Sequence, residues 1–417
     1  MITLTKRFVA SSLAYLIIGH ALGVVYLVKP DLIPHIRPIH THITLLGGVS
    51  FLIMGITYFV IPIFIRKKAF SEKAVNLHFI MANTGLVGMI ISLSLENYSG
   101  LSFFSIIEVI SSYLFLFNIV STAVKGEAVV AAPEEGSALI MRGDRHTDRW
   151  AALFTQVSVI YFVLGCTIGG FMADDPSKWG YLKAHFHINL LGWVTMMIYG
   201  VAYHLFPRFS GSPVKNKSLV KYNFYVANTG LIIMSAALVY RAATGSETST
   251  LHAIITAGII ESAAALMFVY NIMPCVKGSL NKMSRPSLLF IRASITYLVI
   301  GILFGAYMAF NPKKIEMLIP IHAHLNLLGW VMMMIFGVGY YIIPAVAGRK
   351  LFSLKMARVQ FWIANSGLIG FLIILPQNNG DNKPALMIFA ILIVVSILLF
   401  TYNIVKSGAL NSLLDRT

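Results

Sequence analysis

Residues 322–344 read HAHLNLLGWVMMMIFGVGYYIIP, and nearly the same stretch occurs twice earlier in the chain. Residues 185–207 read HFHINLLGWVTMMIYGVAYHLFP, and residues 40–62 read HTHITLLGGVSFLIMGITYFVIP. Each copy opens with two histidines one residue apart and continues as an apolar run of about 20 residues, the length of one membrane-spanning helix. Imidazole binds iron and copper well and is costly to leave without a partner in hydrocarbon. The three His pairs therefore indicate membrane-embedded metal or heme sites.

The composition defines the class of protein. Of 417 residues, 57% are hydrophobic and 12% charged, and the mean hydropathy is +0.78, which is typical of a polytopic membrane protein. We therefore predict an all-α integral membrane protein with twelve transmembrane helices in a single transmembrane domain, residues 1–417. The predicted spans are 8–28, 39–65, 74–95, 101–124, 150–172, 183–206, 219–240, 251–273, 288–310, 318–343, 357–375 and 385–405.

The net charge of +16 follows the predicted topology, so we do not expect nucleic acid as a partner. Most Lys and Arg residues lie at the termini or in alternate loops, as in the group Lys215, Lys217 and Lys221. By the positive-inside rule that side is cytoplasmic. We expect a multi-pass protein of the inner (plasma) membrane with both termini in the cytoplasm and lipid around it. The first apolar run reads as a span and not as a cleavable signal peptide.

Other residues keep step with the His pairs, which indicates an internal repeat. Five residues after the second His stands a Gly, twenty after it a Pro, and forty-one after it the Asn of an Ala-Asn-Thr/Ser-Gly motif. These are Gly47, Gly192 and Gly329; Pro62, Pro207 and Pro344; Asn83, Asn228 and Asn365. We predict three four-helix modules, residues 1–125, 145–280 and 285–410, closed into a pseudo-threefold ring.

Helical geometry divides each His pair between two sites. Residues i and i+2 point about 200° apart, because each residue turns a helix by about 100°. In a ring of three modules, each interface then receives one His from either side. This pairs His40 with His324, His42 with His185, and His187 with His322. Two imidazoles that face each other suit a six-coordinate heme iron.

The quoted stretches also resemble a known family. "RPIHTH", "AHFHINLLGWVTMMIYGVAYHLFPRF" and "HAHLNLLGWVMMMIFGVGYYIIPAVAGR" look like the second, sixth and tenth helices of the heme-copper oxidase catalytic subunit I. C-family oxidases and nitric oxide reductases are the most similar. The resemblance implies that His40 and His324 hold a low-spin heme, that His322 is the axial ligand of a high-spin heme, and that His187 is a copper ligand.

The chain departs from that family at the copper site. The family completes this site with two adjacent histidines in the seventh helix, and the corresponding run LVKYNFYVANTGLIIMSAALVY has none. A complete three-histidine copper site is therefore not expected. His42 and His185 are additional to the standard ligands and suggest a third heme. We expect two or three b hemes. The chain is also compared with the NnrS-like heme membrane proteins, a possible related family.

Two acids stand at matching positions inside predicted spans. Glu108 and Glu261 each lie ten residues before an Asn, where the third module has Ile393. An acid in a span costs about 2.5–3.5 kcal/mol on insertion scales. Two hypotheses stay open, namely a proton path and a protonated helix-packing contact.

Three functions are compatible with these residues. The first is a heme b-binding redox protein with bis-His hemes, for electron transfer or for sensing or handling a small gas such as nitric oxide or O2. The second is a terminal oxidase or nitric oxide reductase with one open high-spin heme and a reduced metal site. The third, a heme-free metal or proton transporter, is disfavoured by the family resemblance. The first two imply an electron donor, for which cytochrome c and quinol are the candidates.

Overall fold

The computed structural model describes residues 2–65, 67–128, 144–278, 284–377 and 382–412. Within these ranges every regular element is a helix, and one isolated bridge joins Lys67 to Ala128. Twelve helices are long and apolar enough to cross a membrane. They are Thr5–Val28, Ile36–Pro62, Glu72–Ser94, Tyr98–Lys125, Arg145–Met172, Pro176–Ser210, Lys217–Thr244, Glu247–Gly278, Arg285–Met308, Met317–Ala345, Leu354–Ile374 and Lys383–Lys406. The all-α fold and the twelve spans predicted from the sequence are confirmed.

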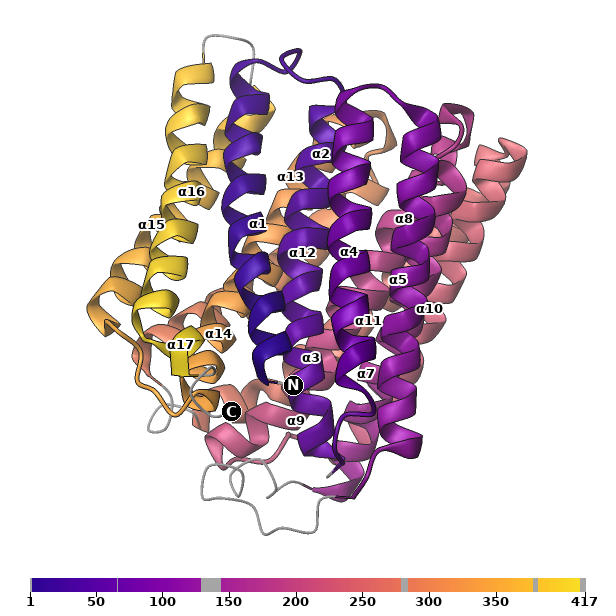
Figure 1. Ribbon diagram of the computed structural model, residues 1–417. Helices are drawn as coiled ribbons and strands as arrows, with labels where there is room; N and C mark the ends of the chain where they lie inside the picture. The colour runs from indigo at the N-terminus through magenta and orange to yellow at the C-terminus, as the bar shows by residue number, and fades with distance from the viewer. Residues whose placement is uncertain (1, 66, 129–143, 279–283, 378–381, 413–417) are drawn as a thin grey trace. The chain divides into compact units, whose positions relative to one another are not determined.

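The chain forms two compact units, which we describe separately. Unit 1 comprises Met1–Pro133, Gly169–Pro176 and Ile342–Thr417, and unit 2 comprises Glu134–Ile168 and Ser177–Tyr341. The main elements of unit 1 are α1 (Ile2–Val28), α2 (Ile36–His42), η1 (Ile43–Ser50), α3 (Phe51–Phe64), α4 (Glu72–Ser94), α5 (Tyr98–Lys125), α15 (Leu354–Ile374), η7 (Leu375–Gln377), α16 (Lys383–Lys406) and α17 (Ala409–Ser412). Within this unit α1 packs on η1, α3 and α16, and α4 lies along α5 (Figure 1).

Unit 2 holds the remaining helices. They are most of α7 (Arg145–Met172), η2 (Pro176–Tyr181), α8 (Leu182–His187), η3 (Ile188–Thr195), α9 (Met196–Ser210), α10 (Lys217–Thr244), α11 (Glu247–Gly278), α12 (Arg285–Ala309), η5 (Pro312–Lys314), α13 (Ile315–His324), η6 (Leu325–Met332) and the first part of α14 (Met333–Val346). Here α11 contacts α9, α10 and α12, and α12 packs on η6. The division into three modules and their arrangement as a ring stay predictions.

Short polar residues begin several of the spans. Ser71, Asn97, Asn216, Ser284 and Ser353 precede α4, α5, α10, α12 and α15, and each side chain accepts a hydrogen bond from a backbone N–H of the first turn. Such N-caps satisfy donors that have no partner inside the helix. The helix boundaries therefore lie where the apolar runs begin, a few residues from the predicted positions.

Each helix that carries a His pair changes its hydrogen-bonding pattern directly after the second His. The next eight residues form the π-helical segments η1, η3 and η6, after which the chain returns to an α-helix. π-Helical turns are rare and are frequent at functional sites. The same unusual backbone therefore follows all three His pairs.

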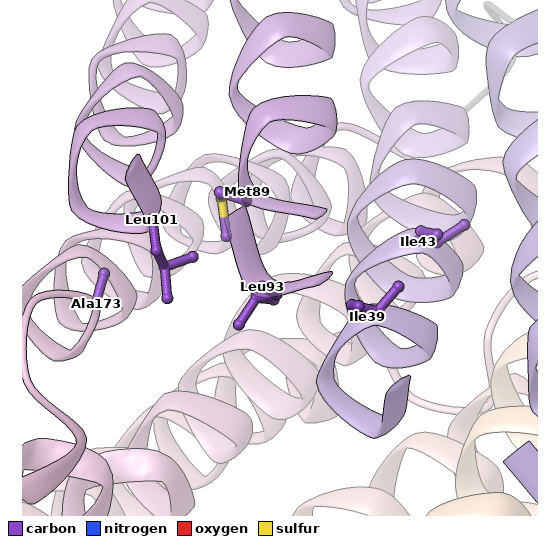
Figure 2. Packing of buried hydrophobic residues seen from close by; sticks show 6 residues of the cluster. All are labelled: Ile39, Ile43, Met89, Leu93, Leu101 and Ala173. Carbon is purple, nitrogen blue, oxygen red and sulfur yellow. The ribbon is translucent and has the colours of Figure 1, made fainter. Parts of the chain in front are cut away.

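The first His pair is seated by packing on one face of its helix. Ile39 and Ile43 belong to a buried cluster with Met89 and Leu93 of α4, and with Leu101 and Ala173 (Figure 2). At about 100° per residue, the imidazoles of His40 and His42 point about 80° to either side of this face. Packing thus fixes the helix while both imidazoles remain beside the contact.

Candidate functional site

The six histidines of the His pairs lie at equivalent places in the structure. His40 and His42 end α2, His185 and His187 end α8, and His322 and His324 end α13, each just before a π-helical segment. All six belong to candidate spans. Each of the six histidines is partly buried, so each ring is removed in part from solvent.

The first histidine of two pairs is tied to the preceding membrane helix. His40 Nδ1 lies 2.6 Å from the Gly19 carbonyl oxygen on α1, and His185 Nδ1 lies 2.9 Å from the Gly165 carbonyl oxygen on α7. A carbonyl oxygen only accepts, so Nδ1 carries the proton in each ring. In the neutral ring Nε2 then keeps its lone pair, which is the form that binds a metal.

The second histidine of every pair is tied to its own helix, one turn back. His42 Nδ1 lies 2.9 Å from the Pro38 carbonyl oxygen, His187 Nδ1 lies 2.7 Å from that of Lys183, and His324 Nδ1 lies 2.7 Å from that of Pro320. Pro38 and Pro320 are therefore used as acceptors. As for the first histidines, the lone pair of a neutral ring lies on Nε2.

His322 is held in a different way. Within the described chain its hydrogen-bond partner is Asn326, whose amide Nδ2 lies 3.4 Å from His322 Nδ1 and 3.5 Å from Nε2. The ring stacks on Phe304 with 6.4 Å between centroids and 15° between planes. Among the six imidazoles, five have an Nδ1–carbonyl bond and His322 is positioned by ring contacts.

Paired glycines on the first helix of each predicted module were missed by the sequence analysis. A Cβ added at Gly19 would lie 2.4 Å from Thr44 Oγ1, and one added at Gly165 would lie 2.3 Å from Asn189 Nδ2. One added at Gly23 would lie 2.9 Å from Cε1 of His40, and one at Gly305 would lie 3.1 Å from Cε1 of His322. The signal was the small-xxx-small spacing of Gly19/Gly23, Gly165/Gly169 and Gly301/Gly305, which permits close helix contact.

In unit 2 the second and third His helices contact each other. The Trp330 Nε1–H of η6 donates to Thr195 Oγ1 at the end of η3 over 3.4 Å, and the ring of Trp330 lies 6.4 Å from that of Tyr199. Unit 2 therefore brings together the two helices that carry His187 and His322, the histidines that the sequence predicts to be a pair.

The other two predicted pairings join residues of different units. His40 and His42 belong to unit 1, and His185 and His324 belong to unit 2. The pairings His40 with His324 and His42 with His185 therefore stay predictions from the sequence.

A protein copper site needs several ligand side chains close together. Across residues 2–65, 67–128, 144–278, 284–377 and 382–412, no group of three or more His, Cys, Asp or Glu side chains is placed to hold a metal ion. The sequence of α10, the seventh span, contains no histidine. The candidate ligands are therefore single imidazoles or pairs of imidazoles. Such ligands suit an iron whose other four positions are filled by a porphyrin.

The two acids in the spans occupy equivalent surroundings. Glu108 is 4% exposed, and neither of its carboxyl oxygens has a hydrogen-bond partner in the described chain. Glu261 Oε1 is likewise buried without a partner. A Cβ added at Gly85 would lie 2.7 Å from Glu108 Oε2, and one added at Gly230 would lie 2.8 Å from Glu261 Oε1. A glycine thus provides the space for each carboxyl group.

A buried ion-pair network in unit 2 was also missed by the sequence analysis. Arg208 is 6% exposed and donates to both oxygens of Asp148, at 2.8 and 2.7 Å, and His204 Nδ1 lies 2.9 Å from Asp148 Oδ1. A charged residue directly after Pro207, at the end of an apolar run, was the available signal. The network links the first turn of α7 to the last turns of α9.

The fold and the His helices together define a polytopic membrane protein of the heme-copper oxidase type, and comparison with known proteins agrees. The family described as Cytochrome C and Quinol oxidase polypeptide I matches residues 34–101, 97–269, 238–378 and 285–411. The chain belongs to this family, whose members typically bind heme and take part in electron transport.

A solved structure supports the same fold. It is described as a cryo-EM structure of a heme-copper terminal oxidase dimer, and it matches with a TM-score of 0.69 over 99% of this chain and 84% of that chain. The two sequences are 12% identical, so this match concerns the fold alone. No curated protein matches the chain in sequence.

Proposed function

We propose that this chain is a heme b-binding membrane redox protein, with bis-His hemes that serve electron transfer or the chemistry of small gases such as nitric oxide or O2. The observation that carries this proposal is the shared state of five imidazoles, in which Nδ1 donates to a backbone carbonyl and Nε2 keeps the lone pair. Such outer-shell bonds orient a metal-binding histidine and raise its basicity.

The chain's own residues supply the ligands and their orientation. In unit 2, His187 and His322 are the pair for one heme, and Gly305 leaves room beside the His322 ring. The pairings His40 with His324 and His42 with His185 extend the proposal to two or three hemes. The bound heme supplies an iron that accepts and donates one electron. Cytochrome c or quinol is the proposed class of electron donor.

Optical spectra of the purified protein test the proposal. Reduced-minus-oxidised difference spectra and a heme count per chain are expected to show two or three b-type hemes. Metal analysis is expected to show iron without stoichiometric copper. A folded, heme-free preparation that does not take up heme would overturn the proposal.

A second candidate function is favoured by the separate position of His322. A terminal oxidase or nitric oxide reductase needs one heme with an open face, and His322 is the imidazole without an Nδ1–carbonyl bond. Carbon monoxide discriminates between the two candidates. Hemes with two firmly bound imidazoles resist carbon monoxide, whereas a heme with an open or readily vacated face binds it.

A further inference from the structure

Glu108 and Glu261 form matching sites in unit 1 and unit 2. Each carboxyl group lies against the glycine of an Ala-Asn-Thr-Gly motif, and the Asn of the same motif binds a tyrosine. The Tyr15 hydroxyl donates to Asn83 Oδ1 over 2.8 Å, and the Tyr161 hydroxyl donates to Asn228 Oδ1 over 2.9 Å. The same polar group is thus built twice.

These sites adjoin the helices that carry the His pairs. A Cβ added at Gly47 of η1 would lie 2.7 Å from Cγ of Tyr15, and one added at Gly192 of η3 would lie 2.6 Å from Cγ of Tyr161. Each tyrosine therefore packs on a π-helical segment at the glycine five residues beyond a His pair, and its hydroxyl binds the Asn two residues before the glycine that the acid contacts. The Asn-Thr-Gly segment and the tyrosine thus lie, in that order, between the acid and the His helix.

Packing alone does not explain the two acids. At the equivalent position Ile393 is 8% exposed, and Gly367 packs on it, with a Cβ at Gly367 lying 3.1 Å from the backbone nitrogen of Ile393. The same helix contact is therefore completed by an apolar side chain. An unpaired buried carboxylate is strongly disfavoured, and the neutral acid is much less so. The acids are consequently expected to carry a proton.

We infer that Glu108 and Glu261 are two proton-binding sites within the membrane-spanning region, each of which holds one proton on its carboxyl group and exchanges it with water. In the exchange, the O–H bond of the neutral acid breaks, the carboxylate keeps the electron pair, and a water molecule takes the proton. The reverse step restores the acid. Within the part of the chain that the structure describes, neither acid belongs to a group of three or more His, Cys, Asp or Glu side chains that could hold a metal ion. This inference does not depend on the presence of heme.

Infrared spectroscopy of the purified full-length protein tests the inference. A neutral carboxylic acid has a C=O stretching band that a carboxylate lacks. Glu108→Gln and Glu261→Gln are each expected to remove one component of this band, and the double variant both. Transfer to D2O is expected to shift the band to lower frequency, because the acid proton exchanges. The matched control is Glu247→Gln, since Glu247 is 77% exposed and paired with Arg241, so the band stays.

Two further variants keep the test decisive if the glutamine variants fold poorly. Glu108→Ile copies the residue of the third module, so it is expected to fold and to lack one component of the band. Ile393→Glu leaves both native acids in place and is expected to add a component beside Gly367. A band that all these substitutions leave unchanged would overturn the inference. So would bands that belong to the two acids but do not shift in D2O, because those protons would be sealed into packing contacts.

Discussion

His187 and His322 lie on contacting helices of unit 2, but their surroundings hold them differently. His187 Nδ1 lies 2.7 Å from a carbonyl oxygen of its own helix, whereas His322 rests on Phe304 and Asn326. Loss of an outer-shell partner typically lowers metal affinity about 10–100-fold. His187 is therefore expected to be the firmer axial ligand of the two, in contrast to the family resemblance, which implies that role for His322.

Two alanine variants test this order. His322→Ala is expected to keep the heme of this pair and to bind carbon monoxide at the vacated position, as seen in carbon monoxide difference spectra. His187→Ala is expected to lose that heme, as seen in the heme count. The reverse pattern, with heme kept in His187→Ala and lost in His322→Ala, would instead support His322 as the permanent ligand.

The glycine beside His40 gives a second test at single-residue scale. In Gly23→Ala the added methyl group would lie 2.9 Å from Cε1 of His40, so the ring must move away from α1. We expect the low-spin heme spectrum to shift or to lose intensity. In the control Gly258→Ala the nearest atom would be 3.9 Å away, which is an ordinary contact, so the spectrum should not change. An unaltered spectrum in Gly23→Ala would remove His40 from the ligands.

At the scale of whole elements, the close contact of α7 with α8 and η3 rests on Gly165. A Cβ there would overlap the side chain of Asn189 at 2.3–2.5 Å, and the carbonyl of Gly165 accepts from His185. We expect Gly165→Ala to lower the free energy of unfolding by about 1–3 kcal/mol, as other overpacked sites do. Thermal unfolding in detergent measures this change.

A glycine of the next span, in η2, serves as the control. In Gly180→Ala the nearest atom would be Ala242 Cβ at 3.7 Å, so no overlap arises. The melting temperature of this variant is expected to stay close to that of the original chain. Equal melting temperatures for the two variants would show that α7 and α8 are not held together at Gly165.

The π-helical segments are the part of the His helices that could not be predicted from the sequence. The run LNLLGWVM in η6 is mostly apolar. Hydropathy therefore predicts a span for it whether its backbone hydrogen bonds are α-helical or π-helical. The hydrogen-bonding pattern depends instead on contacts with other helices, such as that of Gly329 with Tyr297 of α12. The span was therefore predictable, and its internal geometry was not.

At the scale of the molecule, the spans and candidate ligands were predictable because each is local in sequence. A run of apolar residues marks a span, and His185 and His187 are two residues apart. The partners that fix the imidazoles are distant or belong to the backbone. The Gly19 carbonyl lies 21 residues before His40, and position 19 has no side chain that would indicate the contact. The small-xxx-small spacing was readable, but its role required the contacts.

The orientation of the chain in the membrane is a prediction for the whole molecule. The termini and alternate loops carry most of the basic residues, so the positive-inside rule places them in the cytoplasm. Lys73, in the first turn of α4, is exposed on the predicted cytoplasmic side, and Lys313, in η5, is exposed on the other.

Single cysteines at these two positions test the orientation. In a chain with Cys166→Ser and Cys275→Ser, a membrane-impermeant maleimide is expected to label Lys313→Cys in intact cells. It is expected to label Lys73→Cys only after the membrane is opened, because the cytoplasmic face is then accessible. Opened membranes thus serve as the control for the reactivity of both cysteines. Labelling of Lys73→Cys alone in intact cells would reverse the predicted orientation, and with it the predicted placement of the His pairs towards the external face.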